Sequence, residues 1–527
     1  MSDGHWWDSA YQASGALPVR RLGVTAGEWL QCAATLATAG GRLLALWAVP
    51  CASGTTPTVV RAAIAIAARV LVLELTVADD ERDGRTEDSS GTGDYPGLEA
   101  IFPCASRMQR AAYDLCGVRS TDADRRPWLR HAAWPAGWFP LRAADDGDAA
   151  VTAGATVDDY GFRRVQGDGV HEVPVGPVHA GIIEPGHFRF SVVGEKVLRL
   201  ETRLGYTHKG IERRFVELGL FEGHRLAARV SGDSAVAYAW AYCQALEGLA
   251  GCTIPPRAAW LRGLMLEAER IANHLGDLAA LGNDAGFAFG LAQFSRLKER
   301  WLRAIDALFG QRYLMDAIVP GGTAVDVAPH AVQVLAAHAG ELAHEVRALR
   351  QIYDEHDGVR DRFATTGSVS PTLATQLGLI GLAGRASGQA HDARVDWPCA
   401  PYDEVVPAIV VRTDGDVAAR VAVRFDEVLE SCRLVARIAG GLPGGPFRAE
   451  VTLPTASAFG VGVVEAWRGP VLVALDAGPG DRVLRCHPHD PSWQNWPALE
   501  HAIIGNIVPD FPLINKSFNL SYSGHDL

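Results

Sequence analysis

The sequence predicts an α+β protein. A small α/β domain should precede a larger domain built of a β hairpin portion, a central helical bundle and a C-terminal α/β portion. Three observations predict this order: short β-rich runs fill the first part of the chain, helical periodicity extends from 213 to about 382, and strand-like runs return after 405. The 527 residues suffice for two to four domains, and 48% of them are hydrophobic, which allows a large core.

The N-terminal domain is expected to span residues 1–145. Residues 26–38 suit a helix, and β-rich runs of strand length follow at 42–49, 58–66 and 69–77. The acidic, glycine- and serine-rich stretch 78–97 predicts a surface loop. Its GTGDYPG segment lacks the strand–turn–helix setting of a dinucleotide-binding fingerprint. A second small, acidic and aperiodic stretch predicts a linker, which we place at 146–172.

The larger domain is expected to span 173–527, and it should begin with strands and turns over 173–203. Residues 258–282 form the clearest helix, because apolar residues recur there every three or four positions and Gly282 is a plausible stop signal. A long region of such helices predicts a bundle. The strand-like runs that follow are 406–412, 461–465 and 471–475.

Charge and composition exclude several classes of partner. Lys and Arg total 49 against 61 Asp and Glu, a net charge of -12, which disfavours nucleic acid or an anionic lipid surface. No run of 18 or more apolar residues appears, so we expect no direct membrane span, and the polar start does not resemble a signal peptide. The nine cysteines form no C-x-x-C pair, and we expect them to be reduced thiols.

One segment, 176–215, is dense in polar side chains and punctuated by glycines. Alternating apolar residues on either side of a turn at 193–195 predict a hairpin, with His187 just before one strand and Tyr206 just after the other. From the residues alone, a surface hairpin with scattered polar groups is the simpler interpretation. The polar residues are His179, Glu184, His187, Tyr206, His208 and Glu212.

This segment resembles the start of the large subunit of membrane-bound nickel–iron hydrogenases of the formate-hydrogenlyase kind (group 4). It is also similar to the quinone-site subunit of respiratory complex I. The likeness spans essentially 173–527, and 107–119 (RMQRAAYDLCGVR) resembles a signature of the small hydrophilic subunit of complex I. The further matching segments are 228–247, 261–287, 319–326 (VPGGTAVD), 384–398, 442–446 (LPGGP), 463–471 (VVEAWRGPV) and the closing DFPLINKSFNLSYSGHDL.

The sequence also departs from the resembled hydrogenases. Hydrogenases of this kind hold nickel and iron with four cysteine thiolates from R-x-C-G-x-C and D-P-C-x-x-C motifs, and soft sulfur ligands suit such a centre. In this chain those positions are Ser231, Ser234, Ser521 and Gly524, and Cys243 lies too far along the next helical segment to substitute. The usual C-terminal processing tail does not follow Leu527. We therefore expect no nickel–iron centre and no bound metal.

Other positions of the related sites keep polar side chains. The resemblance assigns Glu184 to proton relay, Arg468 to the arginine above the metal, His187 to the quinone-site histidine and Asp284 to that histidine's partner. The quinone tyrosine is replaced by Arg229, which weakens a straight quinone interpretation. Each has a structural alternative: Arg468 in an ion pair, His187 as a hairpin cap, Asp284 at the start of a loop. The sequence similarly favours Tyr238 as a packing residue and His274 as a residue that orders helices.

We expect Glu184, Arg468 and the segment around Ser521 to converge on one pocket, together with Arg229, Ser231, Ser234 and Gly524, which could hold water or a polar ligand. Buried Arg468 should pair with Glu184 or Asp526. Hydrogen bonds among Ser231, Asp233, Ser521 and Tyr522 should replace the lost metal bonds.

The resemblance implies an oxidoreductase subunit that acts within a membrane-bound complex and couples electron transfer to ion translocation, with quinone as a candidate acceptor. No independent hydrogenase activity is expected. The implied partners are an iron–sulfur small subunit, whose clusters this chain does not carry, and membrane ion-translocating subunits, with the chain held peripherally on the cytoplasmic side. The alternative is a catalytically silent scaffold that keeps only the ancestral interfaces.

Overall fold

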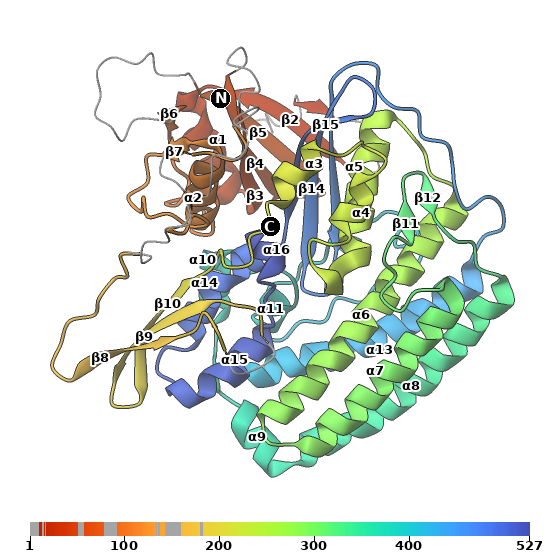
Figure 1. Cartoon of the computed structure of the whole chain (residues 1–527). Helices are drawn as coiled ribbons and strands as arrows, with labels where there is room; N and C mark the ends of the chain where they lie inside the picture. The colour runs from red at the N-terminus through yellow and green to blue at the C-terminus, as the bar shows by residue number, and fades with distance from the viewer. Residues whose placement is uncertain are drawn as a thin grey trace.

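The structure is a computed structural model that describes residues 10–12, 15, 17–50, 57–77, 92–132, 134, 138–142, 160–179 and 183–527. Its mixture of small sheets and many helices confirms the α+β prediction (Figure 1). The N-terminal sheet, a three-stranded sheet and a bundle of long helices surround the C-terminal segment, which lies near the middle of the view.

The N-terminal sheet has the strand order β1-β2-β5-β4-β3, with β2 and β5 parallel and the other pairs antiparallel. The predicted helix and three strands have the predicted bounds. Helix α1 begins with a capping box, in which the Thr25 side chain accepts from the Glu28 amide and the Glu28 carboxylate accepts from the Thr25 amide. The elements are β1 (Tyr11–Gln12), β2 (Val19–Val24), α1 (Ala26–Thr38), β3 (Arg42–Val49), β4 (Thr58–Ile66) and β5 (Arg69–Val77).

A short two-stranded sheet and one helix complete this part of the chain: β6 (Thr92–Tyr95), α2 (Ala105–Cys116) and β7 (Val118–Ser120). The loop predicted at 78–97 is therefore wrong at its end, where residues 92–95 pair with β7; residues 78–91 lie outside the described part. Helix α2 ends at Gly117, which adopts the left-handed conformation with φ 72°.

The predicted hairpin is part of a three-stranded antiparallel sheet of order β10-β9-β8, comprising β8 (Val170–Val175), β9 (His187–Val193) and β10 (Lys196–Arg203). It extends to the lower left in Figure 1. Strand β8 begins within the span predicted as linker, and Tyr160, also in that span, is buried and accepts a hydrogen bond from Arg110. The other linker residues up to 159 lie outside the described part.

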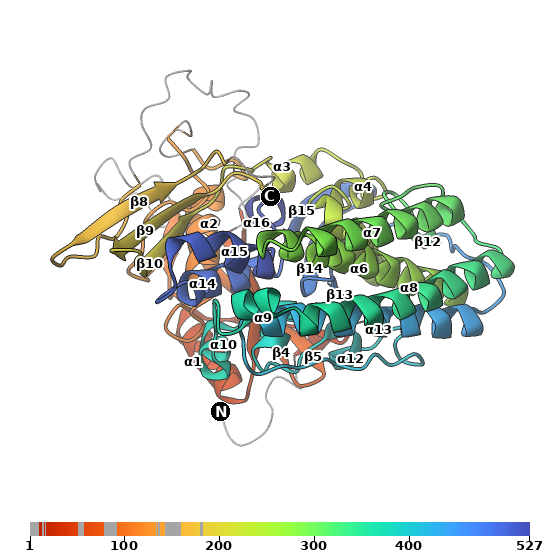
Figure 2. The same cartoon turned by 90° about the horizontal axis from the view of Figure 1, so that it is seen from below.

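Four long helices form the bundle: α6 (Pro256–Asp284), α7 (Ala288–Phe309), α8 (Pro329–Glu355) and α13 (Val417–Gly441). Figure 2 shows them running alongside one another. The predicted apolar face of α6 is buried, but the helix continues through Gly282 to Asp284. A Cβ at Gly282 would lie 2.3 Å from the Tyr353 hydroxyl, so the glycine serves close packing here and does not end the helix. Within the described residues, no helix is long and apolar enough to cross a membrane.

Shorter helices and strands connect the bundle to the rest of the chain. They are α3 (Ile211–Val216), α4 (Gly223–Ala227), η2 (Gly232–Ser234), α5 (Ala235–Ala250), β11 (Ile318–Val319), β12 (Gly322–Thr323), α9 (Asp357–Phe363), α10 (Pro371–Leu377), α11 (Gly381–Ala386) and α12 (Ala393–Asp396). The strand predicted at 406–412 is wrong. Its backbone bonds to the Glu430 side chain and to residues 385–388, and it makes no strand ladder.

The C-terminal portion contains an antiparallel sheet of order β13-β14-β15 and short helices. Helix α5 lies directly on β13, because a Cβ at Gly462 would approach the Ala241 carbonyl oxygen to 1.9 Å and one at Gly460 would approach that of Ala245 to 2.2 Å. The elements are β13 (Ala458–Glu465), β14 (Pro470–Gly478), β15 (Arg482–His489), α14 (Ser492–Ala502), η3 (Val508–Asp510), α15 (Phe511–Phe518) and α16 (Ser523–Asp526).

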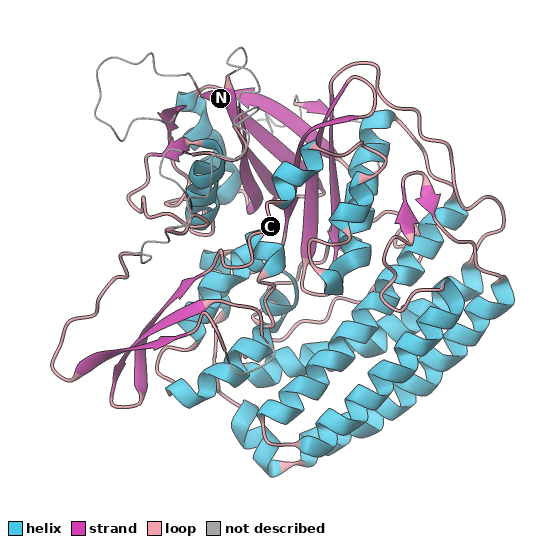
Figure 3. Ribbon diagram, viewed as in Figure 1, coloured by secondary structure: helices cyan, strands magenta, loops and turns pink. Residues whose placement is uncertain are grey.

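The N-terminal sheet and the β13-β14-β15 sheet lie side by side (Figure 3). They pack against each other through one apolar cluster, so the N-terminal part and the C-terminal portion share a core. Leu44, Trp47 and Val72 of the first sheet meet Val461 and Leu472 of the second. Burying such side chains removes apolar surface from water at roughly 25 cal/mol per Å². This packing fixes the sheet that carries Arg468 against the N-terminal part.

Candidate functional site

A cluster of buried polar side chains, called the pocket below, forms where segment 231–234, the loop after β13 and the C-terminal segment 519–524 meet. The hydroxyl oxygens of Ser231 and Ser521 lie 3.0 Å apart, within hydrogen-bond distance, although 290 residues separate them in the sequence. The Ser521 hydroxyl also accepts a hydrogen bond from the Gly524 amide at 2.8 Å. Both serines are buried. Two positions that resemble the ligand pairs of a metal centre therefore meet here through hydroxyl hydrogen bonds.

Arg468 enters this pocket and pairs with Asp233. Its guanidinium donates to both carboxylate oxygens of Asp233 at 2.9 and 2.6 Å and, through Nε, to the Asn519 carbonyl at 2.5 Å. The predicted pairing with Glu184 or Asp526 is wrong. Asp526 is fully buried and accepts instead from Thr207 and from its neighbour His525. Asp233 is two residues from Ser231, which is hydrogen-bonded to Ser521 of the C-terminal segment. The same short segment therefore places the Asp233 carboxylate beside Arg468.

The charge of each partner stabilises the charge of the other. Burial opposes the ionised form of Asp233, but Arg468 and the Ser231 hydroxyl outweigh it and lower the pKa of this carboxyl below its ordinary value. Burial likewise opposes the charge of Arg468, yet Asp233 raises its pKa overall. The guanidinium also lies over the Trp467 ring, 3.9 Å from its centroid, and the Trp467 indole donates to the Asp233 carbonyl at 2.9 Å.

Gly524 is required by close packing on its neighbours. A Cβ at this position would lie 2.4 Å from a carboxylate oxygen of Asp490 and 2.8 Å from the Ser521 hydroxyl. Asp490 follows β15, accepts from the Ser492 amide at 2.8 Å and accepts from the Tyr238 hydroxyl at 2.8 Å. Tyr238 is fully buried, as expected of a packing residue, and it also holds this carboxylate in place. The side chain of Asp490 thus fills the space beside the fourth ligand-like position.

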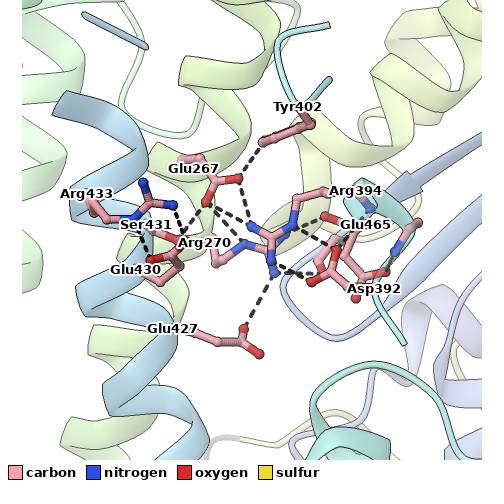
Figure 4. A network of polar contacts seen from close by, with 12 residues as sticks. Glu267, Arg270, Asp392, Arg394, Tyr402, Glu427, Glu430, Ser431, Arg433 and Glu465 are labelled. Carbon is pink, nitrogen blue, oxygen red and sulfur yellow. Dashed lines mark hydrogen bonds and ion pairs between the residues drawn. The ribbon is translucent and has the colours of Figure 1, made fainter. Parts of the chain in front are cut away.

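A buried network of charged side chains supports the loop that carries Arg468 (Figure 4). Arg270 of α6 donates to the carbonyls of Glu465 and Ala466 at 2.6 and 3.1 Å, immediately before Trp467. Arg385 donates to the Glu465 carboxylate at 2.7 Å. Because these guanidinium groups are almost wholly buried, they restrict the position of the residues they bond. The network therefore fixes residues 465–466, which lie just before Arg468 in the chain, and so helps to position Arg468.

The same network ties the bundle helices to one another. Glu267 of α6 accepts from Arg394 at 3.0 Å, from Tyr402 at 2.5 Å and from Ser431 of α13 at 2.6 Å. His274, also on α6, is hydrogen-bonded to Glu427 of α13 at 2.8 Å. This contact agrees with the prediction that His274 orders helices.

Glu184 lies at the edge of the pocket. Its carboxylate accepts a hydrogen bond from the Ser523 amide at 3.2 Å, and its side chain is exposed. The negative charges of Glu184 and Asp526 favour the ammonium of nearby Lys209, although burial lowers the pKa of that lysine overall. Glu184 and Arg468 therefore both contact the C-terminal segment, as the resemblance predicted, but they are not hydrogen-bonded to each other.

His187, Asp284 and Arg229 make their described contacts outside this pocket. His187 begins β9, where its Nδ1 lies 3.1 Å from the Gly176 carbonyl oxygen and Arg189 donates to its Nε2 at 3.3 Å. Asp284 ends α6 and does not begin a loop; burial raises its pKa, while Lys516 and Asn283 act in the other direction.

Arg229 is exposed and forms a two-bond ion pair with Asp316 at 2.6 and 2.9 Å. Ser234 is buried beside the pocket, with its amide bonded to the Ser231 carbonyl at 2.9 Å.

The residues at the four ligand-like positions do not fit a nickel–iron centre. They supply three hydroxyl groups and a glycine, whereas such a centre needs soft thiolate ligands. Within the part of the chain that the structure describes, no group of three or more His, Cys, Asp or Glu side chains is placed to hold a metal ion.

Sequence reasoning did not find two acidic residues of this region. Asp490 gave no signal, because it becomes part of the pocket only when β15 and α14 bring it beside Gly524. Glu269 lies within the amphipathic segment 258–282, where a charged residue is expected on a polar face. In the structure it is buried and accepts from the amides of Val236 and Ala237 at 2.7 and 3.4 Å.

The fold and these positions define a large subunit of the hydrogenase and complex I type, and comparisons with known proteins agree. The family described as "Respiratory-chain NADH dehydrogenase, 49 Kd subunit" matches residues 284–461. Formate hydrogenlyase subunit 5 of Escherichia coli is 31% identical, with 84% of this chain and 78% of that protein covered. The carbon monoxide-induced hydrogenase of Rhodospirillum rubrum is 30% identical, with 66% and 97% covered.

Two further comparisons extend the range of relatives. One subunit of the NADH-quinone oxidoreductase of Phocaeicola vulgatus is 27% identical, with 73% of this chain and 77% of that protein covered. A chain in the structure of the membrane-bound sulfane sulfur reductase, an archaeal respiratory membrane complex, has the same fold. Its TM-score is 0.64 at 23% identity, with 68% of this chain and 98% of that chain covered. The chain therefore belongs to the family of large subunits of group 4 membrane-bound hydrogenases and complex I.

Proposed function

We propose that this chain is the peripheral large subunit of a membrane-bound oxidoreductase complex, where it couples electron transfer to proton movement without a nickel–iron centre. The observation that carries the proposal is the hydrogen-bonded chain Arg468–Asp233–Ser231–Ser521, which joins two hydroxyl groups at ligand-like positions to an ion pair beside them. Such groups can hold and pass protons, whereas apolar residues there would simply have filled the space.

The relatives' printed names support the setting of this function. They are components of hydrogenases and of NADH-quinone oxidoreductases. By this analogy the chain would dock an iron–sulfur small subunit, which would carry the electrons, and membrane subunits that translocate ions. It would sit on the cytoplasmic side of the membrane, and quinone is the acceptor that the complex I relatives suggest.

A second function, that of a silent scaffold, also has an observation in its favour. Asp490 fills the space beside Gly524, and the two serines close on each other, so the ligand-like positions themselves are occupied by the protein. A scaffold of this kind would keep its partners and lose only the redox step.

Affinity purification of the tagged chain from its native membranes tests the proposal. We expect co-purification of an iron–sulfur subunit and of membrane subunits, with iron but no nickel in the preparation. About one nickel per chain, or a chain that purifies without partners, would contradict it. Arg468→Lys in the intact complex separates the two functions. If the pocket acts in the reaction, activity should fall while assembly persists; if the pocket is only structural, activity should fall in parallel with thermal stability.

A further inference from the structure

A cavity of about 340 Å³ opens beside Asp233, between helices α6 and α7 and the loop at 311–315. Most of its wall is apolar and includes Ala272, Leu302 and Ile305. Two acidic residues, Asp233 and Glu269, also line the cavity. A cavity of this size with polar groups on its wall has room for several water molecules.

Glu269 differs from its acidic neighbours in its partners. Its carboxyl accepts only backbone N–H groups of the first turn of α5, and it makes no ion pair with any Lys, Arg or His of the described chain. By contrast, Asp233 is paired with Arg468, and Glu267, two residues earlier on α6, is paired with Arg394. Of these three buried or partly buried acids, Glu269 is the one without a cation to hold it ionised.

The surroundings of Glu269 favour its neutral form. Burial raises the pKa of this carboxyl to about 8; the amide bonds from Val236 and Ala237 and the charge of Arg270 oppose that rise, and the negative charge of Asp233 adds to it. Lys298 of α7 and Arg312 of the 311–315 loop are the other charged groups on the cavity wall, and Arg312 is itself paired with Glu299. Near neutral pH the carboxyl therefore carries a proton, and it can release one within an accessible pH range.

From the cavity and this group we infer that the cavity is a proton-entry site, in which Glu269 holds the proton and the Asp233–Ser231–Ser521 hydrogen bonds lead onward to the pocket. A hydronium ion in the cavity gives its proton to the Glu269 carboxylate and leaves as water. The neutral acid then gives its proton through cavity water to Asp233 and returns to the carboxylate, while Asp233 hands a proton on to the Ser231–Ser521 hydrogen bonds and stays ionised beside Arg468. The inference rests on the proposed function only for the destination of the proton.

Infrared titration of the purified full-length chain tests the proton-holding group. A protonated carboxylic acid gives a C=O stretching band that is separate from the amide bands. We expect such a band at neutral pH, disappearing with a midpoint near pH 8 and absent from Glu269→Gln. Asp284→Asn is the matched control, because it removes another acid of α6 whose pKa burial also raises, and it should leave the pH 8 band in place. The inference would be overturned if a band with a midpoint near pH 8 persists in Glu269→Gln, or if the wild-type chain shows no band with that midpoint.

Glu269→Asp covers the case in which Glu269→Gln does not fold. It keeps a carboxyl but withdraws it by one methylene from the α5 amides, so the midpoint should shift. An unchanged midpoint would assign the band to another acid and overturn the inference.

Hydrogen–deuterium exchange of the same band tests the route. Ala272→Leu narrows the cavity and should slow transfer of the band to its deuterated position several-fold, with little change in midpoint. Ala307→Leu makes the same substitution on an exposed face of α7, where Ala307 lines a different groove, and should exchange at the wild-type rate. Equal rates in both variants would show that protons reach Glu269 by another path and would overturn the proposed entry site. These measurements need no partner subunit, so they can succeed or fail independently of the proposed function.

Discussion

The guanidinium of Arg468 and the carboxylate of Asp233 face each other through two hydrogen bonds, although 235 residues separate them in sequence. The pair joins the loop after β13 to segment 231–234, and the third bond of Arg468, to the Asn519 carbonyl, adds the C-terminal segment. One side chain thus bonds its own loop to both of the other segments. In the hydrogenases that this sequence resembles, metal ligation is expected to join the corresponding segments.

Breaking this pair should destabilise the chain. Asp233→Asn leaves a buried guanidinium with one partner fewer, and since Asp233 is 37% exposed we expect a moderate loss of about 1–3 kcal/mol of unfolding free energy. Arg468→Lys should cost a similar amount, because a lysine cannot make the paired bonds. Chemical denaturation of the purified chain measures both.

The exposed pair Arg229–Asp316 is the matched control, because it has the same residue types and the same two-bond geometry. Asp316→Asn should cost less than about 1 kcal/mol, since exposed ion pairs contribute little. Equal losses at the two sites would show that the Arg468 pair has no special role in the pocket.

The contact between the two serines should appear as a coupling energy. Ser521→Ala removes the acceptor of the buried Gly524 amide and should cost about 1–3 kcal/mol, while Ser231→Ala should cost less. A double-mutant cycle should give a coupling of about 0.5–1.5 kcal/mol between them. Additive losses, with no coupling, would mean that the two hydroxyl groups do not bond to each other in solution.

Gly524 should not tolerate a side chain. Gly524→Ala places a Cβ 2.4 Å from the Asp490 carboxylate, and relieving that overlap should cost about 1–3 kcal/mol. Gly232→Ala, in the same pocket, meets nothing closer than Met315 Cε at 3.7 Å and should change stability by less than about 0.5 kcal/mol. Thermal unfolding of the two variants checks the difference, and a stable Gly524→Ala chain would refute the close packing.

Local pattern predicted the elements of this fold better than it predicted their environment. The first helix and the three strands after it have the predicted bounds because their periodicity and capping are properties of short segments. The strand prediction for 406–412 was wrong for the opposite reason. The run is β-rich, but within the described chain no strand lies beside it to form backbone hydrogen bonds with it. Strand formation depends on a partner elsewhere in the chain, and that partner cannot be read from seven residues.

The pocket shows the same limit at the level of single residues. Ordered motifs predicted that segments 231–234 and 519–524 meet, because the resemblance requires both to bind one centre. They did not predict which carboxylate forms the ion pair with Arg468. The motifs indicated Glu184 and Asp526 as partners. In the structure Asp526 accepts hydrogen bonds from Thr207. Asp233 lies beside Arg468 because Ser231 and Trp467 bond to it and hold its segment in place. Competition among buried partners is decided by packing, which a motif does not contain.

The stability of the chain should depend on pH through Glu269, and the sign follows from its raised pKa. Between the ordinary value of 4.5 and about 8, the folded chain binds this proton more tightly than the unfolded chain does. Stability from this group is therefore fully present below the ordinary value, and it falls as pH rises through that interval by at most about 1.4 kcal/mol per pH unit.

Glu269→Gln cannot ionise, so we expect it to lose less stability than the wild-type chain between pH 5 and 9. Asp233→Asn should differ from it, because the lowered pKa of Asp233 makes its contribution disappear only as pH falls into the acid range. Denaturation curves collected across this range measure all three chains. Parallel pH profiles for wild type and Glu269→Gln would mean that Glu269 is not the group that takes up the proton.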